Sequence, residues 1–115
     1  MSKHVSHSVR ILHILEAVKK IQSYVSTMSE EDFYEDERTM QAVERNFEII
    51  GEAARHVPDS VREKYPEIEW LGMRDMRNFI IHQYNEVEEH VLWNTIQKDL
   101  PPLLVQLEKL LGELR

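Results

Sequence analysis

The chain has 115 residues, no cysteine, and 21 acidic against 14 basic residues, which gives a formal net charge of −7. This length suits one domain with a single core, the lack of cysteine excludes disulfides and thiolate metal sites, and the negative charge opposes diffuse binding to nucleic acid or anionic lipid. No apolar run reaches the roughly 18 residues of a membrane span, and the first residues lack the apolar core of a signal peptide. We therefore expect residues 1–115 to form one soluble, cytoplasmic domain. If this domain binds nucleic acid, a local basic site must overcome the negative net charge.

The first part of the chain predicts a long helix followed by an acidic turn. Apolar residues recur at helical spacing over residues 6–27, which predicts an amphipathic first helix. We expect its buried positions to include Val9, Leu12, Leu15, Val18 and Ile21. Residues 29–37 hold six acidic side chains, so we expect a solvated turn there, anchored by Phe33 and Tyr34.

The remaining residues predict further helices with short connections. Apolar residues at spacings of three and four predict a helix over 40–57, which the following proline ends. Residues 59–64 favour one short helix, and residues 66–83 a longer one. The last helix starts near Glu86, and the run Asp99-Leu100-Pro101-Pro102 makes either a kink or a fresh helix start in it. The predicted fold class is therefore all-α, an antiparallel bundle of four to five helices.

Arg77 is unusual because it falls on the apolar side of its predicted helix. A helical projection places it among Trp70, Met73, Ile80 and Ile81. A guanidinium stays charged and is costly to bury alone. Arg77 must therefore face a carboxylate, a subunit seam or an anionic ligand such as phosphate.

A polar stripe runs beside Arg77 on the same predicted helix. Arg74, Asn78 and His82 lie at spacings of four residues, so they share one side of the helix. Two polar faces of different chemistry thus meet near one helix end, which makes this end the candidate functional site.

The run Arg-Asn-Phe-Ile-Ile-His-Gln-Tyr at residues 77–84 resembles the signature of the HEPN superfamily. That signature has an arginine, a polar residue, three further residues, a histidine, one residue and a tyrosine, and the final tyrosine is similar to that of the HepT toxin branch. Residues 47–54, Phe-Glu-Ile-Ile-Gly-Glu-Ala-Ala, resemble the second-helix motif of this branch. Residues 70–76, Trp-Leu-Gly-Met-Arg-Asp-Met, resemble its lead-in to the signature. The likeness covers nearly the whole chain.

The resemblance implies a HEPN-like helical fold and a metal-independent endoribonuclease without a cofactor, acting as the toxin of a type VII HepT/MntA toxin-antitoxin system. Its partner would be an MntA-like minimal nucleotidyltransferase, which neutralises the toxin by transferring AMP to the signature tyrosine. Residue by residue, Arg77 and His82 would be catalytic with Asn78 in support, Tyr84 would accept AMP, and Arg74 would bind substrate.

The residue types suit RNA cleavage on chemical grounds as well. Attack of a ribose 2′-hydroxyl on the adjacent phosphorus needs a base, an acid and a cation for the developing charge. Histidine exchanges protons near neutral pH, and the planar fork of arginine binds two phosphate oxygens at once. One chain offers one histidine near Arg77 for two proton transfers, so we expect a symmetric homodimer or a higher oligomer.

Each residue also has a purely structural explanation. Arg77 could pair with Glu48 or Glu52 of the second long helix, and His82 could cap a helix end. Asn78 could be an ordinary surface residue and Tyr84 a core tyrosine. His13 and the other scattered histidines form no metal-ligand spacing. The alternative function is a non-catalytic helical module that docks a nucleotidyltransferase.

Overall fold

The computed structural model describes residues 3–82 and 86–114, and this part of the chain is helical without a strand. The all-α prediction is confirmed. In chain order the elements are α1 (Lys3–Val25), α2 (Glu30–Glu35), α3 (Glu37–Arg55), α4 (Asp59–Lys64), α5 (Trp70–His82), α6 (Glu86–Asn94), the π-helical turn η1 (Thr95–Asp99) and α7 (Leu100–Leu114). None of the helices in these ranges is both long and apolar enough to cross a membrane.

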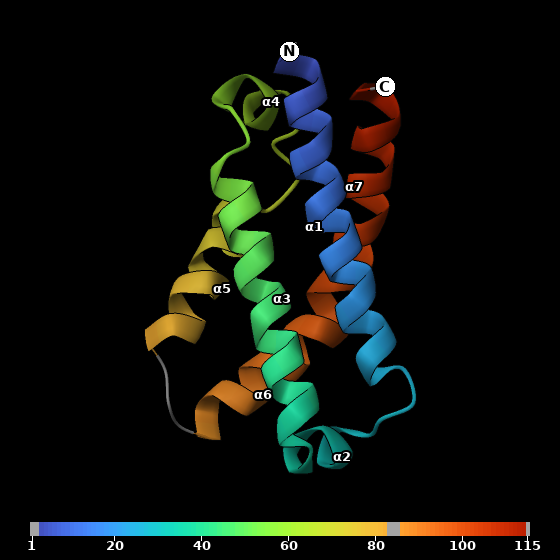
Figure 1. Cartoon of the computed structure of the whole chain (residues 1–115), viewed down its shortest axis with the longest axis vertical. Coiled ribbons are helices and arrows are strands. Elements are labelled where there is room, and N and C mark those ends of the chain that lie inside the picture. The colour runs from blue at the N-terminus through green and yellow to red at the C-terminus, as the bar shows by residue number, and fades with distance from the viewer. Residues whose placement is uncertain (1–2, 83–85, 115) are drawn as a thin grey trace.

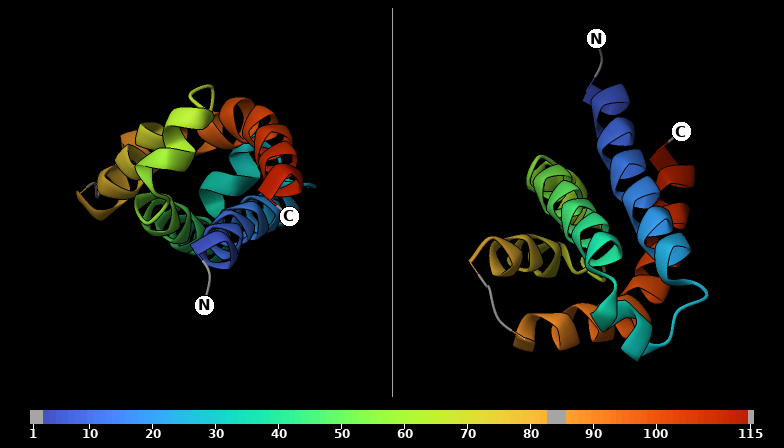
Figure 2. Two further views of the ribbon diagram at one scale, coloured as in Figure 1. Left: turned by 90° about the horizontal axis from the view of Figure 1, so that it is seen from above. Right: turned by 60° about the horizontal axis from the view of Figure 1, so that its bottom comes forward.

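The long helices pack antiparallel to their neighbours, with α3 between α1 and α5. Helix α1 packs against α3 on one side and α7 on the other, whereas the main packing partner of α5 is α3 (Figure 1). Helix α6 lies across the end of the molecule that is opposite the start of α1 (Figure 2). The expected antiparallel bundle is therefore correct, and α3 is the element that connects its two sides.

The buried face of α1 differs from the predicted one at a single position. Leu15, Val18 and Ile21 are buried as expected, and Leu12 is partly buried. Val9 is 41% exposed, so its predicted burial is wrong. The reason is helical phase, because position 9 lies roughly 160° around the helix from the buried Ile11.

The acidic segment predicted as a turn is in fact the short helix α2. The Ser29 hydroxyl accepts a hydrogen bond from the Asp32 backbone N–H at 3.1 Å, and the Asp32 carboxylate accepts one from the Ser29 N–H at 3.2 Å. This reciprocal capping box stabilises a helix start. Acidic residues in the first turn add to this, because they interact favourably with the positive end of the helix dipole. The anchor role of Phe33 is confirmed, since its side chain is fully buried and its ring centroid lies 5.5 Å from that of Trp93.

Helix α5 starts at Trp70, four residues later than the sequence predicts. The Trp70 indole N–H is buried and donates to the Tyr65 carbonyl at 3.1 Å, so the chain between them folds back as a turn. The Tyr65 hydroxyl donates to Glu113 Oε2 at 2.8 Å, and this hydrogen bond is the main reason that the pKa of Tyr65 is raised. The segment that leads into α5 is therefore tied to α7.

The proline pair near the end of the chain lies in the first turn of α7. Prolines have no N–H to donate and cannot continue an α-helix from within. The Leu100 N–H accordingly donates to the Thr95 carbonyl five residues earlier, and η1 connects α6 to α7 without a break. Each predicted outcome is therefore observed in part: the helix continues through this segment with a local change of hydrogen-bond pattern at η1, and α7 starts at Leu100 with both prolines in its first turn.

Candidate functional site

Arg77 lies at a tight contact between α5 and α3. At this crossing α3 carries Gly51, and a Cβ at this position would collide with the Arg77 Cβ and lie 3.0 Å from both the Arg77 Cδ and the Met73 carbonyl oxygen. Only a residue without a side chain permits this approach. Gly51 therefore fixes where the base of the Arg77 side chain lies.

The guanidinium of Arg77 faces Glu52, the neighbour of that glycine. Its Nε lies 3.7 Å from Glu52 Oε2, and the two side chains are 31% and 45% exposed. This contact is an ion pair but is too long for a hydrogen bond. Within the described part of the chain, the two Nη groups make no hydrogen bond. Of the two carboxylates proposed from sequence, Glu52 is the partner, and the forked end of Arg77 remains able to bind an anion.

Glu52 is held in its ionised form. His56 Nε2 lies 3.1 Å from Glu52 Oε1, and the hydrogen bond from His56 is the largest cause of a lowered pKa for Glu52; the positive charges of Arg55 and Arg77 lower it further. A carboxylate with a lowered pKa stays negative at neutral pH. It therefore continues to attract Arg77 under those conditions.

Two of the other predicted residues, Arg74 and Asn78, make no hydrogen bond or ion pair with Arg77. Arg74 and Asn78 are exposed on α5, and in the described part of the chain neither side chain has a hydrogen bond or an ion pair. His82 is the last residue of α5, and Tyr84 lies outside the described residues. Positions 77 and 82 are separated by roughly 140° around an α-helix, so they lie on different sides of α5.

Arg77 forms one wall of a pocket that the sequence does not predict. This Arg77 pocket has a volume of about 270 Å³ and is formed by residues of α1, α3 and α5. It is lined by Arg10 and His13 of α1, by Arg45, Glu48, Ile49, Glu52 and Ala53 of α3, and by Arg77 itself. The expectation of one histidine near Arg77 is therefore wrong, because His13 shares the pocket. The sequence does place Arg10 and His13 on one side of a helix, but it cannot reveal which helix that side meets.

The charges of the Arg77 pocket are positive in sum. Three arginines face two glutamates, before His13 is counted. Arg45 Nη1 lies 3.6 Å from Glu48 Oε2 and Arg77 pairs with Glu52, so both carboxylates are already engaged. In a chain whose net charge is −7, this is the local basic site that binding of an anionic polymer requires.

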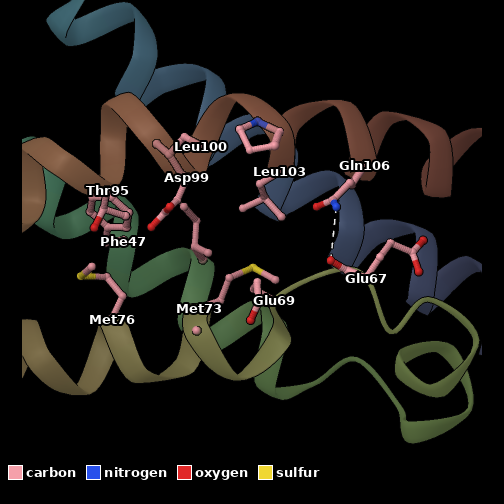
Figure 3. Close-up of a pocket in the computed structure, with 13 residues that line it drawn as sticks. Phe47, Glu67, Glu69, Met73, Met76, Thr95, Asp99, Leu100, Leu103 and Gln106 are labelled. Carbon is pink, nitrogen blue, oxygen red and sulfur yellow. Dashed lines mark hydrogen bonds between the residues drawn. The ribbon is translucent and has the colours of Figure 1, made fainter.

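A larger cavity lies on the opposite side of α3. Its volume is about 490 Å³, and its floor is apolar, with Phe47, Met73 and Leu103 among the lining residues (Figure 3). Its charged lining residues in the described part of the chain are the acidic Glu67, Glu69 and Asp99. Negative side chains repel a phosphate, so this cavity does not suit an anionic substrate, and the smaller Arg77 pocket is the candidate site.

The structure is thus an all-α protein with a pocket of positive summed charge, to which the helix that carries the arginine-histidine signature contributes Arg77. The model of the family described as ribonuclease HepT-like matches residues 14–110. The chain belongs to this HepT-like ribonuclease family. The resemblance to the HEPN-type ribonucleases that the signature indicates is thereby confirmed.

Individual relatives agree with this assignment. The chain is 40% identical over 105 residues to a probable ribonuclease HepT of Thermococcus cleftensis, which covers 91% of this chain and 96% of that protein. It is 36% identical over 99 residues to a candidate RNase of Caldanaerobacter subterraneus, covering 86% of this chain and 88% of that protein. It is also 37% identical over 102 residues to a longer protein of Methanocaldococcus jannaschii named as a gamma-glutamylcyclotransferase and candidate RNase, covering 89% of this chain and 46% of that protein. No solved structure matches.

Proposed function

We propose that this chain is a metal-independent endoribonuclease and the toxin of a type VII HepT/MntA toxin-antitoxin system. The observation that carries the proposal is the state of Arg77. Its guanidinium pairs with Glu52 through Nε, and Arg77 lines a pocket whose charges are positive in sum. This is the arrangement that a phosphate-binding arginine needs. Membership of the HepT-like ribonuclease family supports it.

The proposed reaction needs no group beyond the chain and the RNA. The ribose 2′-oxygen attacks the adjacent phosphorus while a base takes its proton, and the bond from phosphorus to the 5′-oxygen breaks while an acid protonates that oxygen. The products are a 2′,3′-cyclic phosphate and a 5′-hydroxyl. His82 performs a proton transfer, Arg77 neutralises the charge that develops on the phosphorus oxygens, Asn78 supports them, and exposed Arg74 binds substrate.

We further propose that the active form is a homodimer or a higher oligomer. Positions 77 and 82 lie roughly 140° apart around an α-helix, so they are on different sides of α5. A two-fold seam that includes α5 would bring Arg77 of one protomer toward the His82 end of the other. Each composite site would then contain both groups.

Regulation in this proposal centres on Tyr84. An MntA-like minimal nucleotidyltransferase would transfer AMP to its hydroxyl, two residues beyond His82. The added phosphate is an anion that competes with RNA for Arg77. Inhibition then follows from occupation of the site and needs no change of fold.

A non-catalytic binding module is the second candidate. It is favoured by one observation, that Glu52 already gives Arg77 a charged partner, as ion pairs with a structural role do. In this case the helical surface would dock the nucleotidyltransferase without cutting RNA.

Cleavage of RNA in the presence of a chelator separates the two functions. We would incubate the purified protein with total RNA in EDTA, beside Arg77→Ala, His82→Ala and the control Lys20→Ala, which changes an exposed residue of α1 outside the pocket. The ribonuclease predicts cleavage by the parent and by Lys20→Ala, and none by the other two. Intact RNA in all four reactions would overturn the ribonuclease and favour the binding module.

A further inference from the structure

Arg10 and His13 bring basic side chains to the Arg77 pocket from a helix that the proposed reaction does not use. They lie three residues apart on α1, so they share one side of the helix, and both line the pocket. Arg10 is partly buried and His13 is exposed. Within the described ranges, neither side chain has a hydrogen bond or an ion pair.

The pocket has no carboxylate left to neutralise them. Glu48 is paired with Arg45, and Glu52 is shared by His56 and Arg77. Arginine side chains that serve stability normally have a carboxylate partner when they are partly buried. Arg10 and Arg77 thus line the same pocket, and both carboxylates among its lining residues are paired with cations other than Arg10.

The size and the lining of the Arg77 pocket indicate which kind of anion fits. Its volume of about 270 Å³ is roughly that of nine liquid water molecules, more than a single phosphate needs. Between the basic walls on α1 and α5, α3 supplies the apolar side chains Ile49 and Ala53 as part of the lining. A nucleic-acid strand, in which charged phosphates alternate with less polar sugars and bases, matches such a surface better than an isolated phosphate ion does.

We propose that Arg10 and His13 form a second phosphodiester-binding subsite, through which single-stranded RNA crosses α3 from the phosphate at Arg77 toward α1. The subsite rests on the proposed function, because it takes RNA as the substrate. Arg10 holds the phosphate of a neighbouring nucleotide through its planar fork, and His13 donates a hydrogen bond to the same backbone. This interaction compensates for the repulsion between RNA and a chain of net charge −7.

The test measures binding of RNA that cannot be cleaved. A short fluorescein-labelled single-stranded RNA with 2′-O-methyl riboses lacks the attacking hydroxyl, and its anisotropy reports binding over a series of salt concentrations. For single strands, each phosphate that the protein no longer neutralises reduces the slope of log K against log salt by about 0.7. We expect Arg10→Gln to weaken binding and to reduce the slope by about this amount, whereas Lys20→Gln, a change of one charge elsewhere on α1, keeps the slope of the parent.

Two further variants make the result decisive. Arg10→Lys keeps the charge and is expected to restore the slope, and failure to do so would overturn an electrostatic contact with phosphate. With cleavable RNA, His13→Gln is expected to raise KM and leave kcat unchanged. A fall in kcat at saturating RNA would overturn the binding role and assign His13 to proton transfer.

The outcomes also separate this inference from the proposed function. If the parent cleaves RNA but Arg10→Gln keeps the full slope, the subsite is overturned and the ribonuclease stands. If the parent does not cleave RNA but Arg10→Gln has a reduced slope, the subsite is upheld and the ribonuclease is overturned.

Discussion

Gly51 of α3 and Arg77 of α5 lie so close together that any side chain at position 51 would collide with the Arg77 Cβ. The two helices can cross at this point only because the glycine leaves room. The contact links packing directly to the candidate site, since the same crossing that buries the apolar side of α5 sets the direction of the Arg77 guanidinium. A change at position 51 should therefore affect stability and activity together.

Gly51→Ala is expected to destabilise the fold by about 1–3 kcal/mol, the usual cost of overpacking a tight contact, and to abolish RNA cleavage because Arg77 is displaced. The matched control is Gly112→Ala on α7, where a Cβ would meet nothing within 4 Å. Alanine favours a helix over glycine by about 1 kcal/mol, so the control should be slightly stabilised and fully active. Urea denaturation and an RNA cleavage assay measure both effects. A Gly51→Ala protein as stable and active as the parent would contradict the tight crossing.

Arg77→Lys is expected to recover little of the cleavage that Arg77→Ala removes. Lysine keeps the positive charge but offers a single ammonium group where two phosphate oxygens must be bound at once. Because the pair with Glu52 is partly exposed, both variants should stay folded. Steady-state kinetics and thermal melting test this. If Arg77→Ala unfolds at a much lower temperature, Arg77 is mainly structural, and full activity of the lysine variant would argue against two-pronged binding.

Glu52→Gln is expected to tighten RNA binding at neutral pH, since it removes the anion that competes with phosphate for Arg77. The Glu52→Gln variant should also lose less stability than the parent as the pH is lowered. The pKa of Glu52 is lowered by folding, so its contribution to stability is present above the ordinary value of 4.5 and is lost as the pH falls through the lower folded value.

Thermal midpoints measured from neutral pH downward, together with RNA anisotropy, test both parts of the Glu52 prediction. The control is Glu63→Gln, an exposed change on α4 far from the pocket lining, which should leave the acid slope as it is in the parent. Weaker RNA binding by Glu52→Gln would mean that holding Arg77 in place matters more than removing the competing charge.

Periodicity sufficed to predict the helices, and the errors have local causes. At α2, the Ser29 and Asp32 pair is a helix-start signal, but the excess of acidic residues suggested a solvated turn instead. At Val9, the helix was predicted correctly and only the burial of this one position was wrong. The carboxylate partner of Arg77 was predicted as one of two candidates because both lie on α3 near the expected contact, and the register of the crossing, set by Gly51, selected Glu52.

The pocket itself could not be predicted in the same way. It depends on α1 lying beside α3 opposite α5, which is a tertiary arrangement that no local pattern encodes. The sequence pattern assigns no role to Arg10 and groups His13 with the scattered histidines, and only the fold shows that both share a pocket with Arg77. The roles of His82 and Tyr84 stay predictions, and mutation tests them.

His82→Ala is expected to abolish RNA cleavage and growth toxicity while the protein remains folded, because position 82 is the last residue of α5 and a change at a helix end perturbs little packing. Cleavage assays, growth curves on induced expression and circular dichroism measure these effects. His90→Ala on α6 is the histidine control, since it lies outside the Arg77 pocket and should stay active. If His82→Ala cleaves RNA as fast as the parent, the catalytic assignment is wrong.

Tyr84→Phe is expected to escape neutralisation by the partner enzyme. Phenylalanine lacks the hydroxyl that would form the bond to AMP, so co-expression with an MntA-like nucleotidyltransferase should leave this variant unmodified and toxic, whereas the parent should gain the mass of one or more AMP units and lose activity. The loss should come without unfolding, because the added phosphate acts by occupying Arg77 and repelling the RNA backbone. Tyr24→Phe is a suitable control, as Tyr24 is exposed on α1 and lies outside the pocket. Intact-mass spectrometry of each co-expressed protein reads the result directly, and AMP still present on Tyr84→Phe would place the switch on another residue.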